Sequence, residues 1–447
     1  MTQGLTAHTT RWQRAAGLEL LGLVSGTGLN RSSYLVRRAD GQVVQLTELL
    51  HRILNEAERP LPPAELAQRV SNSYGRELDV DGLTILAESK LEPLGLLKHP
   101  GTDVSAPAPT AAPLLALSAK TTVVPRGAVE RLSGLLRILF WPPVVIAACL
   151  ALVALDIQLF VVADAATALT AVLMTPQMML ALVVLMTVGA LVHEVGHATA
   201  CRYGGATPGV IGVGLYLVFP AFYTDVTDSY RLDRAGRLRT DLGGLYFHLW
   251  WVLSAGAGYL LTGSPLLLLL VIVTQLQMVQ QLPPAVRLDG YFVLADLAGV
   301  PDLFSRVVPV LRSLIPGRSP DPRVLELRPI SRWIVTSWVL IIIPFLAFVL
   351  AWVAISLPFI ISQAIGAAAI HAQTLAVAVA LAQPLEATMA LLGILLLAMP
   401  TVGAVLVLSK IALSIGQWAV GRLRVRPPHP LPRHAAPSRR LRIGRHS

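Results

Sequence analysis

The chain has 447 residues, of which 54% are hydrophobic and only 14% are charged, and its mean hydropathy is +0.63. A soluble globular protein carries about 25% charged residues, so this composition excludes a wholly soluble chain and predicts extensive contact with lipid. The net charge of +10 is uneven, because residues 422–447 hold eight Arg and no acid, and beside a membrane helix such a segment indicates the cytoplasmic face rather than nucleic-acid binding.

Residues 1–98 are predicted to form a small domain without net charge, since they contain 11 Lys or Arg and 11 Asp or Glu. Two strands, over 33–36 and 42–46, flank Asp40-Gly41, a dipeptide typical of a hairpin turn. Apolar spacing predicts helices over 47–55, 63–74 and 80–91, and a closing strand over 95–97. This order of elements is a winged-helix plan, an α+β arrangement.

The segment from Val43 to Leu97 resembles PqqD-like domains, which hold the leader peptides of ribosomally made, modified peptides. The resemblance implies that a leader peptide is a partner, bound by adding a strand to an exposed sheet edge. A DNA-binding winged helix is the alternative interpretation. Affinity for phosphate requires a basic face, and this domain is neutral, so nucleic acid is not expected as a partner.

A linker over 99–127, rich in Pro and Ala, precedes a membrane domain over 128–420, and a basic tail over 421–447 is predicted to be disordered. Six segments have close to the ~20 residues needed to cross the hydrocarbon core; they are 138–160, 178–201, 243–262, 265–283, 333–356 and 386–409. The apolar stretches 209–223 and 357–385 are candidates for re-entrant segments. The predicted fold class is therefore mainly α, a polytopic helical bundle with a small N-terminal α+β domain.

The distribution of positive charge predicts the topology. From Arg137 onward, Lys and Arg occur in 202–239, in 287–332 and after Ser409, whereas the other links between segments have none. Positive residues are retained on the cytoplasmic side, and six crossings with both termini inside satisfy this rule. No secretory signal is found in the first 50 residues. We expect a multi-pass protein of the cytoplasmic membrane.

The second predicted membrane segment ends in His193-Glu194-Val195-Gly196-His197, an H-E-x-x-H motif. Two His residues four positions apart lie on one face of a helix and can share a zinc ion, while the Glu takes a proton from zinc-bound water. Such residues are costly in a lipid-spanning helix and indicate function there. The alternative is that they pair with polar groups of neighbouring helices.

A catalytic zinc needs three protein ligands and an open position. Asp289 follows the fourth predicted segment on the same side of the membrane as the two His residues, so it is the expected third ligand. Gly290 allows a tight backbone turn beside it. The alternative is that Asp289 belongs to an ordinary loop turn.

This combination, HEVGH in a membrane helix followed by P-x-x-x-L-D-G at Pro284–Gly290, resembles the site-2-protease family of intramembrane zinc metalloproteases. The resemblance implies one zinc ion held by His193, His197 and Asp289, with Glu194 activating water. Residues 220–232 and 287–303 resemble a bacterial branch of peptide zinc metalloproteases, including those of daptide biosynthesis. The chain departs from the family at Gln281, where Asn is usual, and at Pro283, and these changes concern substrate positioning.

Other polar residues carry weaker predictions. Cys201 lies one turn after His197, but a helix-packing role is favoured over metal binding. His248 and His371 are expected to be packing residues, with His371 on the opposite side of the membrane. Two groups are left open between a structural role and contact with substrate: a loop group, Tyr223, Asp225, Asp228 and Tyr230, and an amide group, Gln275, Gln277, Gln280 and Gln281.

We expect a membrane-embedded zinc metalloprotease that removes the leader from a precursor peptide. Regulated intramembrane proteolysis of a membrane-bound regulator is one alternative. Another is a non-catalytic export or immunity protein that keeps zinc for structure, in which Glu194 would be dispensable. The expected partners are a peptide substrate and the lipid bilayer.

Overall fold

The computed structural model describes residues 11–24, 26–39, 43–98, 118–216, 218–300 and 302–424. The predicted Asp40-Gly41 turn, most of the predicted linker and the tail beyond Arg424 lie outside these residues. The protein is mainly helical, with a small sheet region near its N-terminus, as predicted. Within the described residues, four helices are long and apolar enough to cross a membrane.

The N-terminal region (residues 11–98) contains every strand and helix expected there. Its antiparallel sheet has the order β2-β3-β4, and a separate pair joins β1 to β5. The elements are β1 (Gln13–Arg14), β2 (Glu19–Leu23), β3 (Ser33–Arg37), β4 (Val43–Thr47), α1 (Glu48–Glu56), α2 (Pro63–Tyr74), α3 (Val80–Leu86), the π-helix η1 (Ala87–Leu91) and β5 (Leu97–Lys98). Trp12, Ile53, Leu66 and Leu83 are fully buried in its core. Strands β1 and β2 were not predicted.

This region packs directly against the rest of the chain. The backbone N–H of Gly28 donates to the carbonyl of Gly299 over 2.8 Å, and the N–H of Arg328 donates to the carbonyl of Gly28 over 2.8 Å. Arg37 forms an ion pair with Asp228 at 3.2 Å. The N-terminal region is therefore docked at the end of the helical bundle by backbone hydrogen bonds as well as by charge.

A second sheet lies beside the bundle, with the antiparallel order β6-β7-β8. Its strands are β6 (Ser118–Val124), β7 (Ile211–Tyr216) and β8 (Phe219–Thr224). The stretch 209–223, a candidate re-entrant segment by its sequence, contains most of the β7–β8 hairpin. Likewise, the end of the predicted linker is strand β6. Ile211 packs with Val195 and Ala198 of α7, so a face of the hairpin covers the helix that carries the H-E-x-x-H motif.

The helical part begins with α4 (Arg126–Leu136), the 3-10 helix η2 (Arg137–Phe140), α5 (Pro142–Val162), α6 (Ala165–Met174) and α7 (Pro176–Tyr203). It continues through η3 (Thr227–Arg231), α8 (Arg234–Asp241), α9 (Gly243–Thr262), α10 (Pro265–Gln281), α11 (Asp289–Ala298), η4 (Phe304–Arg306), α12 (Val307–Ser313) and α13 (Pro322–Leu325). It ends with α14 (Pro329–Ala380) and α15 (Pro384–Arg424). The four helices that can cross a membrane are α5, α7, α14 and α15.

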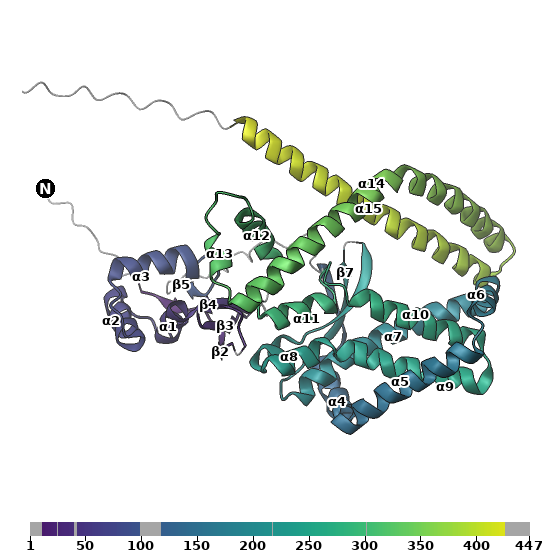
Figure 1. Ribbon diagram of the computed structural model, residues 1–447, viewed down its shortest axis with the longest axis horizontal. Helices are drawn as coiled ribbons and strands as arrows, with labels where there is room; N and C mark the ends of the chain where they lie inside the picture. The colour runs from purple at the N-terminus through teal and green to yellow at the C-terminus, as the bar shows by residue number, and fades with distance from the viewer. Residues whose placement is uncertain are drawn as a thin grey trace, which may run out of the picture.

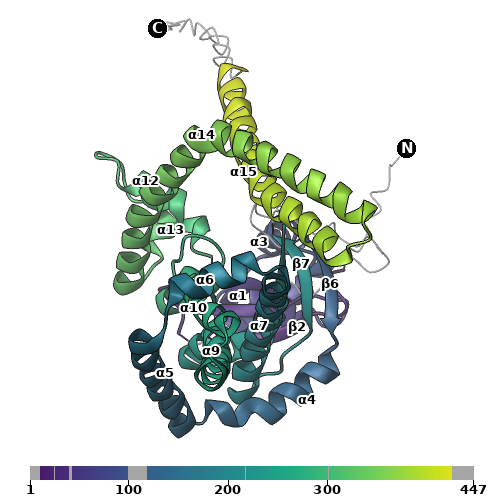
Figure 2. The ribbon, with the colours of Figure 1, turned by 90° about the vertical axis from the view of Figure 1, so that its right-hand side faces the viewer.

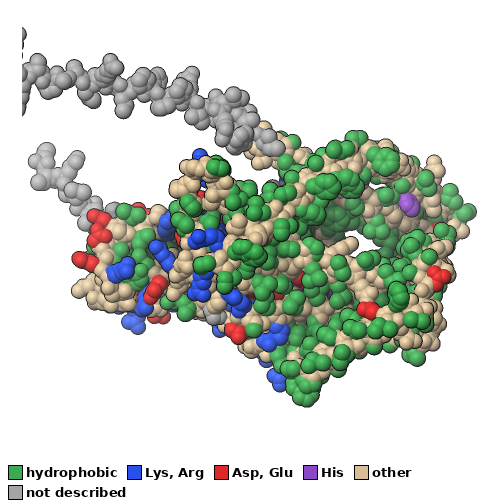
Figure 3. Space-filling view, in the orientation of Figure 1, with side chains coloured by type: hydrophobic (Ala, Val, Ile, Leu, Met, Phe, Trp, Pro, Cys, Tyr) green, Lys and Arg blue, Asp and Glu red, His purple; other side chains and the backbone are tan. Residues whose placement is uncertain are grey.

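Helices α5, α7, α9 and α10 form a bundle, and α14 and α15 form a long hairpin along one side of it (Figures 1 and 2). Hydrophobic side chains cover the bundle and the hairpin, whereas Lys and Arg gather toward the end where the N-terminal region lies (Figure 3). All six predicted membrane segments are helical, although α10 has only 17 residues. The stretch 357–385, the other candidate re-entrant segment, belongs to α14 as far as Ala380, after which the chain turns into α15.

Candidate metal centre

His193, His197 and Asp289 come together as the sequence predicted. The Nε2 atoms of the two His residues are 3.0 Å apart. Asp289 Oδ2 lies 3.2 Å from His193 Nε2, and Asp289 Oδ1 lies 3.5 Å from His197 Nε2. One ligand atom from each residue lies within 4.8 Å of the others. Helices α7 and α11 thus bring two imidazoles and a carboxylate to a single point, where they could hold a metal ion.

The hydrogen bonds around these residues fit a cation. His197 Nδ1 lies 2.8 Å from the carbonyl oxygen of Thr240, which requires the proton on Nδ1 and leaves a lone pair on Nε2. Asp289 Oδ2 is buried without a hydrogen-bond partner among the described residues. Burial alone would raise the pKa of Asp289, but the imidazoles of His197 and His193 lower it below its usual range. The site therefore brings an ionised carboxylate against the Nε2 atoms of two imidazoles, the donor set of many metal sites.

Glycines allow helix α9 to approach these ligands. A Cβ at Gly244 would lie 2.5 Å from His197 Nε2 and would also overlap the His193 ring. One turn along α7, a Cβ at Gly196 would meet the backbone of Gly243 and lie 2.8 Å from Phe247 Cβ. The two helices consequently cross backbone to backbone at the metal centre, and this contact limits the motion of both imidazoles.

Asp289 is the first residue of α11, and the turn before it is held from two sides. A Cβ at Gly290 would overlap the carbonyl of Leu282, so the chain can double back there only with glycine. On the other side, the indole N–H of Trp338 donates to the carbonyl oxygen of Pro284 over 2.9 Å. Tyr291, which is 1% exposed, anchors the same end of the helix in the core.

Helix α8 connects the His ligands to the Asp ligand. Its Thr240 carbonyl orients His197, and its Arg237, which is 3% exposed, forms an ion pair with Asp296 of α11 at 2.8 Å. Asp241, the last residue of α8, is close to the same carboxylate. Burial and Asp296 raise the pKa of Asp241 to about 8. One short helix therefore fixes the orientation of one ligand and the position of the helix that carries another.

Glu194 is held by the hairpin that covers α7. The hydroxyl of Thr224, the last residue of β8, lies 2.7 Å from Glu194 Oε2 and 2.9 Å from the backbone carbonyl oxygen of Glu194. The carboxylate is thus fixed beside the metal ligands, and its neighbours in sequence are His193 and Val195. Sequence reasoning identified Glu194 but did not single out Thr224, Thr240 or Gly244.

The weaker candidates have mainly structural roles. The His248 ring packs against His193 with 4.5 Å between ring centroids, and Cys201 is buried outside the ligand group. Gln275 bonds across helices to Asp156 at 2.7 Å. In the loop group, Asp228 accepts from the N–H of Thr207 and pairs with Arg37, and Asp225 accepts from the N–H of Thr227. For Gln275, Asp225 and Asp228, these bonds support the structural role of the two that the sequence left open.

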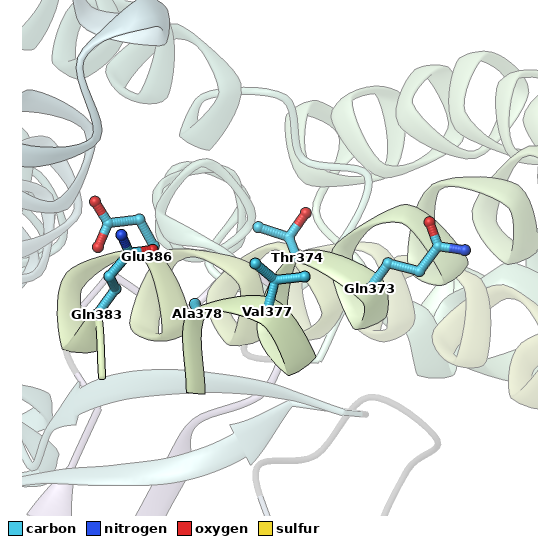
Figure 4. Close-up of a pocket in the computed structure, with 6 residues that line it drawn as sticks. All are labelled: Gln373, Thr374, Val377, Ala378, Gln383 and Glu386. Atoms are coloured by element: carbon cyan, nitrogen blue, oxygen red, sulfur yellow. The ribbon is translucent and has the colours of Figure 1, made fainter. Parts of the chain in front are cut away.

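A pocket lies apart from the metal centre, at the turn between α14 and α15 (Figure 4). It is lined by Gln373, Thr374, Val377, Ala378, Gln383 and Glu386. His371 lies on α14 near this turn, where its ring contacts Gly393 of α15. Neither the pocket nor His371 contributes to the metal centre, which forms between α7, α8, α9 and α11.

No family model, no curated protein and no solved structure matches the chain.

Proposed function

We propose that this protein is a membrane-embedded zinc metalloprotease of the site-2-protease type. The observation that carries the proposal is the convergence of two imidazole nitrogens and one carboxylate on a single point, with Glu194 next to His193 in the sequence. Three protein ligands with a neighbouring Glu is the arrangement of a catalytic zinc site, whereas structural zinc sites have four protein ligands. Among the described residues, the group holds three.

In this proposal, His193, His197 and Asp289 hold the zinc ion, which when bound polarises a carbonyl and activates water at neutral pH. Glu194 takes the proton of the attacking water on its carboxylate and delivers it to the nitrogen of the leaving amine, so that the peptide bond is replaced by a carboxyl group and a free amine. Thr240 keeps His197 in the tautomer that can bind metal. The packing of α9 on α7 excludes bulk water from one side of the site.

The protein is proposed to be a multi-pass protein of the cytoplasmic membrane, with six crossings and both termini in the cytoplasm. The charge distribution supports this, because every link assigned to the far side lacks Lys and Arg. Helix α14 has 52 residues, and at 1.5 Å per residue it is about 78 Å long. This is more than twice the ~30 Å hydrocarbon core, so α14 supplies one crossing and continues beyond the bilayer.

The proposed substrate is a precursor peptide whose leader is held by the N-terminal region while the bond beside the core peptide is cut. Support comes from the resemblance of this region to PqqD-like domains and from its packing against the elements that flank the metal centre. Gly28 bonds to the end of α11, and Arg37 pairs with Asp228, four residues after Thr224. A peptide bound there would lie at the same end of the bundle as the metal ligands.

The test is to express the chain with a candidate precursor peptide encoded beside it and to follow the peptide by mass spectrometry. The parent is compared with Glu194→Gln, which removes the base, and with Glu386→Gln, the same substitution at the α14–α15 turn. We expect new peptide termini with the parent and with Glu386→Gln and none with Glu194→Gln, while all three proteins contain zinc. Identical products from all three would sink the protease proposal and favour a role for zinc in structure alone.

A second comparison tests the substrate class. Fluorescein-labelled casein serves as an unstructured substrate without a leader, and the precursor peptide is offered with and without its leader. If the N-terminal region recognises leaders, the leader-bearing peptide is cut fastest at low concentration, because bound leader raises the local concentration of the scissile bond. Equal rates for the three substrates would refute the recognition role and leave the hydrolytic role standing.

A further inference from the structure

The side chain of Glu194 accepts a hydrogen bond from Thr224, a residue outside helix α7. Thr224 ends strand β8 and pairs with Ile211 of β7, whose side chain packs on α7. This packing fixes the distance between the hairpin and α7 and leaves the Thr224 hydroxyl 2.7 Å from Glu194 Oε2. The contact therefore depends on two elements of regular structure rather than on a flexible loop.

The hydroxyl has two acceptors but only one proton to donate. It lies 2.7 Å from the Oε2 carboxylate oxygen and 2.9 Å from the backbone carbonyl oxygen of the same residue. The shorter of the two contacts is the one to Oε2, so the hydroxyl donates to the carboxylate and ties it to the end of the hairpin.

We propose that Thr224 is the positioning residue of the proposed protease, holding Glu194 through Oε2 so that Oε1 faces the water to be activated. The inference rests on the proposed function. The hydrogen bond comes from a strand end that is paired with Ile211 and packed on α7, so it holds Glu194 in one rotamer without any movement of the backbone. A base that is already in position needs no reorganisation, which is how a preorganised site lowers a barrier.

The inference predicts a loss in kcat rather than in substrate binding. Replacing Thr224 by Val keeps the shape and the strand preference of the side chain but removes the hydroxyl, so Glu194 can leave its position. Removing an outer partner of a metal-site residue commonly costs about 10- to 100-fold. We expect Thr224→Val to lower kcat by this factor with little change in KM or in zinc content, and Thr224→Ser, which restores the hydroxyl, to recover most of the rate.

A matched control is Thr199, which lies on α7 about one turn after Glu194. Thr199 is fully buried, and its hydroxyl donates to the carbonyl oxygen of Val195 over 2.7 Å. Thr199→Val thus removes a buried hydroxyl that bonds only to the backbone of the same helix, and it should leave kcat near that of the parent. Zinc content and melting temperature are measured on every variant in detergent, so that a folding defect is separated from a catalytic one.

The outcomes separate this inference from the proposed function. If Glu194→Gln is inactive but Thr224→Val has the kcat of the parent, the positioning role is refuted and the protease proposal survives. If Thr224→Val raises KM or loses zinc while kcat is kept, Thr224 acts on substrate or on structure, and the inference also fails. Failure of Thr224→Ser to recover the rate contradicts it as well. If Glu194→Gln is as active as the parent, the proposed function itself falls.

Discussion

Gly244 lies where helix α9 crosses the two His ligands, and its replacement by Ala perturbs the metal centre without touching a ligand. The new Cβ would lie 2.5 Å from His197 Nε2. Ordinary contact begins at 3.4 Å, so the atoms must separate by 3.4 − 2.5 = 0.9 Å. On its other sides α9 packs against α5 and α10, with Val252 and Ala255 buried in their shared core, which leaves α9 little freedom to retreat. The imidazoles must therefore move.

A movement of this size is large for a metal site, in which ligand distances are held to about 0.2 Å. We expect Gly244→Ala to weaken zinc binding about 10- to 100-fold, which corresponds to ~1.4 to ~2.7 kcal/mol. A helix interior is more stable with alanine than with glycine by roughly 0.5–1 kcal/mol. The substitution should therefore not weaken α9, so weaker zinc binding would reflect displacement of the ligands.

The assay is zinc affinity by competition with a chelator, measured on the detergent-solubilised full chain. The control is Gly258→Ala in the same helix, where the new Cβ would lie 2.8 Å from the Cδ1 atom of Leu267, the mobile end of a flexible side chain. The control should bind zinc like the parent. If Gly244→Ala also binds zinc like the parent, then either the metal is held elsewhere or α9 does not pack against the ligands as described.

Three further predictions concern the surroundings of the site. Replacing the buried Arg237 by Met leaves the Asp296 carboxylate, which is 17% exposed, without this ion-pair partner. The change should cost up to about 3 kcal/mol and lower the melting temperature; an unchanged melting temperature would contradict the pair. The pKa of Asp241 is raised to about 8, against ~3.9 for an unfolded Asp, so its contribution to stability is present below pH ~4 and is lost as the pH rises toward 8. Asp241→Asn should therefore lose less melting temperature than the parent between pH 5 and pH 9, and parallel curves would speak against the shifted pKa. Finally, Gly28→Val should speed hydrogen exchange in α11, because the new side chain overlaps the backbone of that helix. The control Gly127→Val places its side chain in open space and should not change the exchange. Equal exchange in the two variants would show that docking of the N-terminal region does not stabilise α11.

Much of this architecture follows from local sequence. Hydropathy alone marks the apolar helices, because crossing the hydrocarbon core requires a run of about 20 apolar residues. The pairing of His193 with His197 follows from helical periodicity, since four residues complete about one turn. Asp289 was placed with them by charge and hydropathy, which assigned both segments to the same end of the bundle. Each of these inferences uses spacing along one element or the order of elements.

The strands of the hairpin over 209–223 were not predicted, for a physical reason. An apolar run of this length fits either a membrane segment or a buried pair of strands, and local composition does not distinguish them. The decision came from β6, which lies about ninety residues earlier and supplies the third strand. Pairing between distant strands has no periodic trace in either segment.

Sequence alone therefore determined which residues can bind a metal, because ligand chemistry and helical spacing are properties of the side chains and of one helix. Only the tertiary structure decided how those residues are held. The Thr240 carbonyl belongs to the backbone and would be present with any side chain. The space at Gly244 has meaning only once α9 lies against α7, and the Thr224 hydroxyl reaches Glu194 only because a distant hairpin packs on the same helix.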